Sequence, residues 1–148
     1  MSQSKEQDLL PLFVILESIG KIKIYAEDFH DAYLFFHFED QAKFNASLLL
    51  LINIGEQSLR FSKDLRTDHS HLPFDAMRGL RNRIAHDYIG IDYEMVFDII
   101  KNDISNLELL LMALLKAEIA QGKFDMGELN AAKSSPFYRH INFDFLIS

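Results

Sequence analysis

Apolar residues recur every three or four positions through most of the first 115 residues, and this spacing constrains the fold more than any other feature. The period is that of an α-helix with one buried face. From residue 9 to residue 29, charged side chains separate the apolar positions Leu12, Ile15, Leu16, Ile19, Ile22, Ala26 and Phe29. The pattern predicts an amphipathic helix over residues 9–29. Residues 1–8 are polar, and we expect them to fray.

The longest apolar segment covers residues 41–65, and its apolar side chains occupy more than one face. Such a helix is covered on more than one side. Gly55 interrupts it, and glycine costs about 0.8 to 1.0 kcal/mol relative to alanine inside a helix. We therefore expect another backbone, from the helix that begins at Pro73 or from a second subunit, to approach closely there. Glu56 either orients an arginine or is a solvated or helix-pairing glutamate. Residues 31–40 are rich in aromatics and either begin this helix or form a short separate one.

The second half of the chain carries clearer boundary signals. Residues 66–72 read as a polar loop, and Pro73 suits the first turn of a helix whose buried stripe contains Phe74, Met77 and Leu80. Asp92 is a good N-cap for the next helix. Residues 105–108, Ser-Asn-Leu-Glu, have the form of a capping box, which predicts a kink or restart near residues 102–105 before the helix resumes to residue 115 or slightly beyond.

The chain of 148 residues, 49% of them hydrophobic, is long enough to bury a substantial core in one domain. We expect an all-α, up-and-down bundle of four to five helices over residues 1–120. From residue 121 the composition shifts to glycine, proline and aromatic residues. We expect residues 121–148 to be a C-terminal extension with a short helix at 128–133 and an extended aromatic tail, packed on the same domain.

The segment of residues 79–90, GLRNRIAHDYIG, places arginine, histidine and tyrosine side chains between two glycines, and these are the best candidates for chemical function in the chain. Arginine pairs with phosphate through a planar fork, and histidine can take and return a proton near neutral pH. Arg81 and His86 together therefore favour phosphoryl chemistry. They are five residues apart, about 500° or a net of roughly 140° on a straight helix. Either the helix ends near this point and the chain turns, or a second copy of the segment completes the pair across a two-fold axis.

Four residues separate Arg81 from His86, one residue separates His86 from Tyr88, and the polar Asn82 directly follows the arginine. This order resembles the signature of the HepT-like branch of the HEPN superfamily, the ribonuclease toxins of two-gene toxin-antitoxin systems. The likeness extends from about residue 9 to residue 115 and includes residues 15–19, 54–56 and 92–94 in the expected order. An Arg/His/Tyr triplet alone is a weak pattern, and its all-helical setting adds weight.

The resemblance implies a homodimer in which two motifs face one another, and a metal-independent endoribonuclease that cleaves mRNA or tRNA. Arg81 and His86 would be catalytic. Asn82, Arg78 and Arg83 would bind the phosphate. Tyr88 would be the site at which a nucleotidyltransferase-fold (MNT) antitoxin attaches AMP, as in a type VII-like system; the alternative for Tyr88 is a core or interface aromatic with a satisfied hydroxyl.

Two alternatives remain open from the residues. The motif can grip a nucleotide or a partner protein without cleaving anything, as a non-catalytic HEPN binding module. In the second alternative the chain is a structural helical dimer whose arginines only form salt links. Both accommodate the same side chains, because phosphate binding does not by itself require activation of the 2′-hydroxyl.

Composition excludes several classes. The 15 Lys and Arg against 22 Asp and Glu give a formal net charge of −7, which argues against a general DNA or RNA coat protein. Without cysteine there are no disulfides or thiolate sites, which is consistent with the cytoplasm. The cluster at residues 68–71, Asp-His-Ser-His, is the one metal-like group, but an adjacent loop triplet without a distant fourth ligand is usually solvated, so we predict no metal or other cofactor. The apolar run of residues 9–16 is too short for a membrane span.

Overall fold

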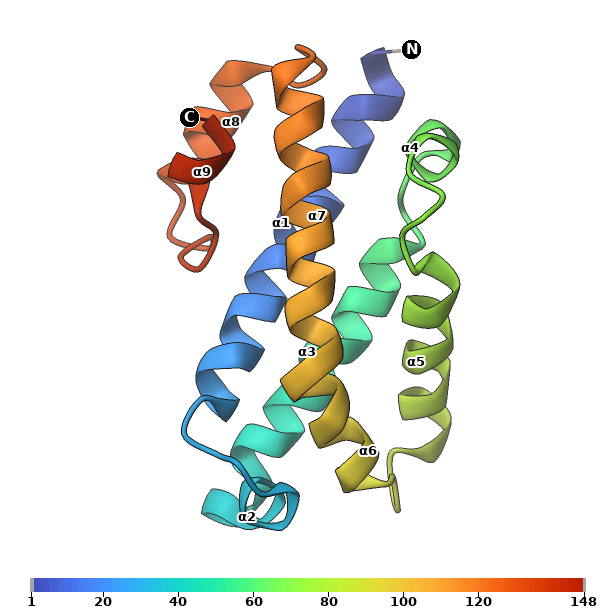
Figure 1. The fold of residues 1–148 in the computed structure, drawn as a ribbon, viewed down its shortest axis with the longest axis vertical. Helices are drawn as coiled ribbons and strands as arrows, with labels where there is room; N and C mark the ends of the chain where they lie inside the picture. Colours follow the sequence, from blue (N-terminus) through green and yellow to red (C-terminus); the bar gives the residue numbers. More distant parts are fainter. Residues whose placement is uncertain (1, 148) are drawn as a thin grey trace.

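A computed structural model describes the backbone of residues 2–147 and the side chains of residues 7–147. Four long helical runs form the bundle, and there is no strand among the described residues (Figure 1). The all-α prediction is confirmed. The runs are α1 (Ser2–Ala26), α3 (Ala42–Ser58), α5 (Phe74–Asp87) and the continuous series α6 (Tyr93–Asp98), η2 (Ile99–Asp103) and α7 (Ile104–Ala120).

Short helices connect and follow the long ones, and several of them differ from the predicted secondary structure. They are α2 (Ala32–His37), the 3-10 turn η1 (Phe38–Gln41), α4 (Lys63–Asp68), α8 (Met126–Lys133) and α9 (Phe143–Ile147). The aromatic segment is thus a separate helix. The predicted loop of residues 66–72 is partly α4, because the Ser62 hydroxyl accepts a hydrogen bond from the Leu65 amide and caps that helix. The aromatic tail, predicted extended, ends in α9.

The helix ends also differ from the predicted ones. Residues 2–8 were expected to fray but belong to α1, because Asp8 and Leu9 are buried and tie the first turns to the bundle. The third helix was predicted to run to residue 65 and ends at Ser58. Apolar periodicity does not mark that end, because Phe61 and Leu65 beyond it are also buried.

The series α6–η2–α7 bends without stopping. Asp92 caps α6 as predicted, by accepting hydrogen bonds from the Glu94 and Met95 amides. The predicted irregularity is the π-helical turn of residues 99–103, after which α7 continues. The capping-box interpretation of Ser105 was wrong, because the residues around it are already helical and Glu108 instead binds the Lys23 ammonium at 2.7 Å.

The C-terminal extension returns to the middle of α1. The Glu17 carboxylate is buried and accepts hydrogen bonds from the His140 amide (2.8 Å) and the His140 ring (2.5 Å). Gly20, one turn further along α1, makes this approach possible, because a Cβ at that position would overlap His140. Phe13 packs against the rings of Tyr138 and Phe143 at centroid distances of 5.3 and 5.4 Å.

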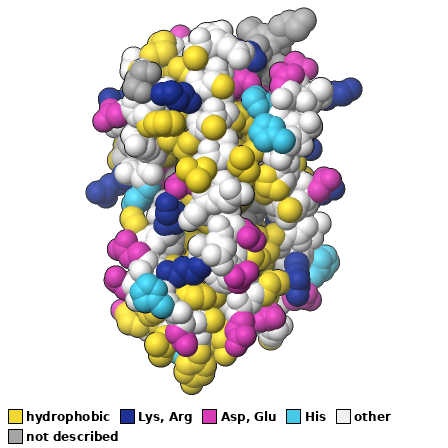
Figure 2. Space-filling model, viewed as in Figure 1, with side chains coloured by type: hydrophobic (Ala, Val, Ile, Leu, Met, Phe, Trp, Pro, Cys, Tyr) yellow, Lys and Arg dark blue, Asp and Glu magenta, His cyan; other side chains and the backbone are white. Residues whose placement is uncertain are grey.

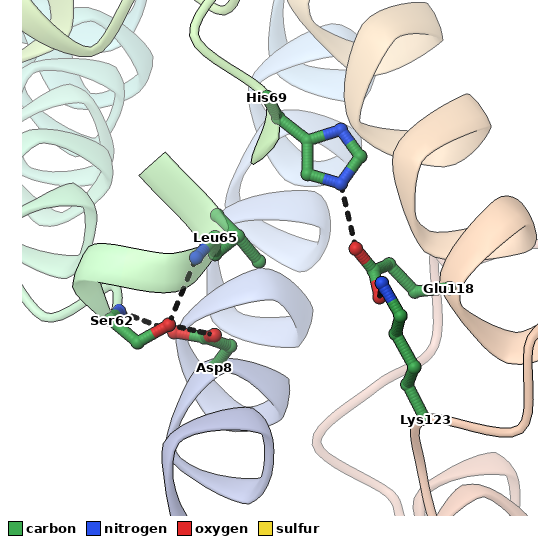
Figure 3. Close-up of polar contacts among 6 residues, drawn as sticks. All are labelled: Asp8, Ser62, Leu65, His69, Glu118 and Lys123. Atoms are coloured by element: carbon green, nitrogen blue, oxygen red, sulfur yellow. Dashed lines mark hydrogen bonds and ion pairs between the residues drawn. The ribbon is translucent and has the colours of Figure 1, made fainter. Parts of the chain in front are cut away.

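Two polar clusters hold α4 against the ends of α1 and α7 (Figure 3). Asp8 is buried and accepts hydrogen bonds from the amide and the hydroxyl of Ser62, both at 2.6 Å. The buried Glu118 carboxylate binds the His69 ring at 2.7 Å and the Lys123 ammonium at 3.0 Å. A buried carboxylate is tolerated only when such partners compensate its lost hydration.

We expect the Glu118 cluster to make the fold sensitive to acid. Burial acts to raise the pKa of the Glu118 carboxyl, but the hydrogen bonds from His69 and Lys123 outweigh it and lower that pKa below its ordinary value of 4.5. The folded state therefore binds fewer protons than the unfolded state, so this contribution to stability is complete above the ordinary pKa and is lost as the pH falls through the lowered one.

Glu118→Gln tests this expectation. At neutral pH the variant should lose about 1 to 3 kcal/mol of unfolding free energy, because the Lys123 ammonium and the His69 ring lose a negatively charged acceptor. Below about pH 4.5 its stability should fall less steeply than that of the parent. Urea unfolding at a series of pH values measures both. Glu128→Gln, at an exposed position of α8, is the control. Parallel pH profiles for the parent and Glu118→Gln would contradict the assignment.

Candidate active site

Helix α5 carries every residue of the proposed motif. Its buried stripe of Met77 and Ile84 packs on α3, which leaves the intervening polar residues on the outer surface. The helix runs unbroken through Arg81 and His86 to Asp87, and the chain turns only at the following residues, where Gly90 has a φ of +87°. The turn thus comes too late to bring Arg81 and His86 together, and the roughly 140° separation holds within one chain.

Arg81 is the most strongly positioned residue of the motif. Its Nε and one terminal nitrogen bind the Glu56 carboxylate at 2.6 and 2.5 Å. Its other terminal nitrogen donates to the Asn82 side-chain oxygen at 2.9 Å. Of the five N–H groups of a guanidinium, two remain for a ligand. The interpretation that Glu56 orients an arginine is confirmed. The sequence supported the alternative interpretation, a solvated or helix-pairing glutamate, equally well.

Gly55 explains why Glu56 can reach Arg81. A Cβ on Gly55 would overlap the Arg81 Cβ and lie 2.9 Å from the Met77 carbonyl oxygen. The predicted close approach is therefore between α3 and the motif helix of the same chain. The glycine lets the two helices pack closely enough for two nitrogens of Arg81 to bind one carboxylate oxygen of Glu56, which orients the guanidinium.

The other motif residues lie on the outer face or in the exit turn. His86, Asn82 and Arg83 are exposed, and within residues 7–147 the His86 imidazole has no hydrogen-bond partner. Tyr88 is 51% exposed and follows the end of the helix. The site thus unites Arg81 with Asn82 and Glu56, while His86 and Tyr88 point into solvent without contacts to them.

The arginine cluster is partly neutralised. Arg78 binds Asp75 at 3.2 Å in an exposed pair, and Arg81 binds Glu56. The Arg78–Asp75 pair is exposed, and such pairs contribute little to stability, typically below about 1 kcal/mol, so a phosphate can compete for Arg78. The salt-link interpretation thus describes two of the three arginines; Arg83 has no carboxylate partner among the described side chains.

The described part of the chain contains no group of three or more ligand-type side chains placed to hold a metal ion. The His69 ring of the metal-like cluster is turned to Glu118, and His71 only faces His69 at a centroid distance of 6.0 Å. Of the helices in residues 2–147, none is long and apolar enough to cross a membrane.

Comparison with known proteins finds one family and several of its curated members. Residues 15–114 match the model of the family described as Ribonuclease HepT-like. "Putative RNase MJ0127" of Methanocaldococcus jannaschii is 30% identical over 96 residues, which are 64% of this chain and 76% of that protein. "Putative RNase TTE0752" of Caldanaerobacter subterraneus is 31% identical over 65 residues, 44% of this chain and 58% of that protein.

"Probable ribonuclease HepT" of Thermococcus cleftensis is 31% identical over 55 residues, 37% of this chain and 50% of that protein. The chain spans about half the length of most of the curated relatives it matches. No solved structure gives a significant match. Because the family model covers more than half of the chain, and covers the bundle and the motif helix together, the chain belongs to the HepT-like ribonuclease family of HEPN proteins.

Proposed function

We propose that this chain is the toxin of a type VII-like HEPN/MNT toxin-antitoxin system and acts as a metal-independent endoribonuclease in the cytoplasm. The observation that carries the proposal is the guanidinium of Arg81, fixed by Glu56 and Asn82, on the same helix as a free imidazole at His86. A fixed cation and a free acid–base group are the two components that RNA transesterification requires.

In this mechanism His86 removes the proton from an RNA 2′-hydroxyl as its oxygen attacks the neighbouring phosphorus. The bond from phosphorus to the 5′-oxygen breaks, and a protonated imidazole supplies the proton to that leaving oxygen. The products are a 2′,3′-cyclic phosphate and a 5′-hydroxyl. The two free N–H groups of Arg81 stabilise the charge that builds on the phosphoryl oxygens. Asn82, Arg78 and Arg83 bind the flanking phosphates.

The mechanism needs two chains. Arg81 and His86 diverge on α5, so a second copy across a two-fold axis would bring the imidazole of its own His86 to the cleft. One imidazole then acts as base and the other as acid. The exposed Leu49 and the half-buried Ile52 lie on the outer side of α3 beside Glu56, and they supply apolar area for such a contact.

Incubation of the purified protein with RNA in excess EDTA tests the proposed activity. We expect cleavage to proceed, and the new ends to be 2′,3′-cyclic phosphates and 5′-hydroxyls. Cleavage that requires a divalent cation, or that leaves 3′-hydroxyl ends, would exclude the mechanism. RNA binding without cleavage would favour the non-catalytic module.

We further propose that Tyr88 is the site of control by an MNT-type nucleotidyltransferase antitoxin. Its phenol is half exposed in the turn two residues after His86. A nucleotide attached to its oxygen would add negative charge and bulk where the RNA phosphate must approach, and would neutralise the arginines.

Co-expression with a neighbouring nucleotidyltransferase should therefore add about 329 Da, the mass of an AMP group, to a peptide containing Tyr88 and abolish cleavage. Tyr88→Phe should remain unmodified and active. Tyr93→Phe is the matched control, because Tyr93 is half-buried and stacked on Phe36. If the antitoxin silences Tyr88→Phe without a change in mass, inhibition is by occlusion and not by modification.

A further inference from the structure

The end of the bundle at α2 exposes apolar and aromatic side chains that the core does not use. Tyr33 is 57% exposed, Leu34 60% and Phe38 37%. We call these three residues, together with the carboxylates of Asp31 and Asp40 at their edges, the α2 patch. Figure 2 shows hydrophobic side chains gathered at this lower end of the molecule, with acidic side chains near them.

The α2 patch rests on a rigid base. The opposite side of α2 is anchored by Phe35, which is fully buried, and by Phe36, whose ring stacks on Tyr93 at a centroid distance of 4.5 Å. On the outer side Tyr33 lies against the His37 ring at 4.1 Å. Rigid, exposed rings lose little conformational entropy when a partner binds, so they are typical of interaction surfaces.

The backbone of residues 39–41, at the edge of the patch, is strained. Glu39, Asp40 and Gln41 have φ angles of 48°, 55° and 69°, in the left-handed region. This conformation costs a residue other than glycine roughly 1–2 kcal/mol. The turn presents the Glu39 and Asp40 carboxylates to solvent beside Phe38, and the 3-10 turn has no side-chain cap. Backbone strain of this kind is concentrated at ligand-binding segments.

The charge around the patch selects the kind of partner. Residues 27–43 contain five carboxylates and a single cationic side chain, Lys43. A polyanion such as RNA is repelled by this surface, whereas a cationic segment is attracted. The chain itself provides an example of the contact, because the Lys43 ammonium lies 4.9 Å above the Phe38 ring and 5.6 Å from the Phe29 ring.

We propose that the α2 patch binds a partner protein through a segment that carries arginine or lysine side chains between apolar ones. The apolar residues pack on Leu34 and Phe38. The cations lie over the Tyr33 ring and pair with the Asp31, Glu39 and Asp40 carboxylates. This surface is separate from the α5 motif, and its occupancy does not depend on ribonuclease activity.

Titration of the ¹⁵N-labelled chain with a peptide of about ten alternating arginine and leucine residues tests the proposal. We expect amide-signal changes confined to residues 31–43 and the neighbouring start of α6. Binding should weaken as salt rises, because exposed charges are screened. A peptide with glutamate in place of arginine, and an oligouridylate, should leave these signals unchanged.

Two variants separate binding from folding. Tyr33→Ser should weaken binding of the arginine peptide about two- to fivefold, which is the contribution of an exposed cation–π contact. Asp40→Gly should weaken binding of the peptide by a similar factor. It should also raise the melting temperature, since glycine adopts the left-handed conformation without strain. Glu128→Gln changes the net charge by the same amount as Asp40→Gly but lies on α8, so it should bind the peptide like the parent.

Four outcomes would overturn the proposal. The first is signal changes spread over all exposed carboxylates. The second is equal weakening by Asp40→Gly and Glu128→Gln, which would mean binding to net charge alone. The third is an oligouridylate that shifts the patch signals, which would make it an RNA surface. The fourth is a patch whose signals move with protein concentration alone, which would make the occupant a second copy of the chain.

Discussion

His86→Ala should lower the rate of RNA cleavage by a factor of about 10² to 10⁴, the usual contribution of a positioned general acid or base. Arg81→Ala should lower it by about 10² to 10³, by analogy with the loss of one donor to a developing oxyanion. The His86 side chain is exposed and has no hydrogen-bond partner within residues 7–147, so its removal should leave stability nearly unchanged. Initial rates with a labelled RNA, combined with thermal unfolding, measure both effects.

Matched variants make these losses interpretable. His30→Ala removes another exposed imidazole, far along the sequence from α5, and Arg60→Ala removes an exposed arginine at the end of α3; both should retain full activity. All four proteins should sediment as dimers at micromolar concentration. Unchanged activity in His86→Ala would remove His86 from the mechanism, and an active monomer would remove the shared cleft.

Glu56→Gln separates positioning of Arg81 from catalysis by it. The amide keeps the size of the carboxylate but not its charge, so one strong ion pair is lost and the guanidinium is held less firmly. Glu56→Gln therefore changes only the orientation of the Arg81 guanidinium, whereas Arg81→Ala also removes its positive charge.

The sequence predicted the main helices because their buried faces have a clear period. It predicted the N-cap at Asp92 and the close approach at Gly55 because each depends on a single residue with a specific conformational role. The sequence left open whether the helix ends between Arg81 and His86, and the structure shows that α5 continues to Asp87.

Features that depend on distant contacts could not be predicted. The helical first turns of α1 depend on Asp8 meeting Ser62, 54 residues away. The path of the extension depends on Glu17 receiving His140, 123 residues away. Neither carboxylate differs in sequence context from a solvated one. The choice between the two interpretations of Glu56 likewise required the packing of α3 against α5.

The same substitution at two glycines should have opposite effects on stability. Gly55→Ala and Gly79→Ala both lie inside helices and gain about 0.8 to 1.0 kcal/mol of helix propensity. At Gly79 a methyl group meets no atom within 4 Å, so the gain should appear as a higher melting temperature. At Gly55 the methyl group would overlap Arg81 and approach the Met77 carbonyl, so α3 and α5 must separate.

Because the propensity gain is common to both variants, the difference between them isolates the cost of overpacking, about 1 to 3 kcal/mol. Urea unfolding measures it directly. Displacement of α5 also moves the Arg81 guanidinium from Glu56, and a misplacement of about 1 Å can lower a catalytic rate 10²-fold. We therefore expect Gly55→Ala to cleave RNA much more slowly than Gly79→Ala at temperatures where both are folded. Equal stabilities would show that the two helices repack without strain, and equal rates with unequal stabilities would show that the position of Arg81 tolerates that repacking.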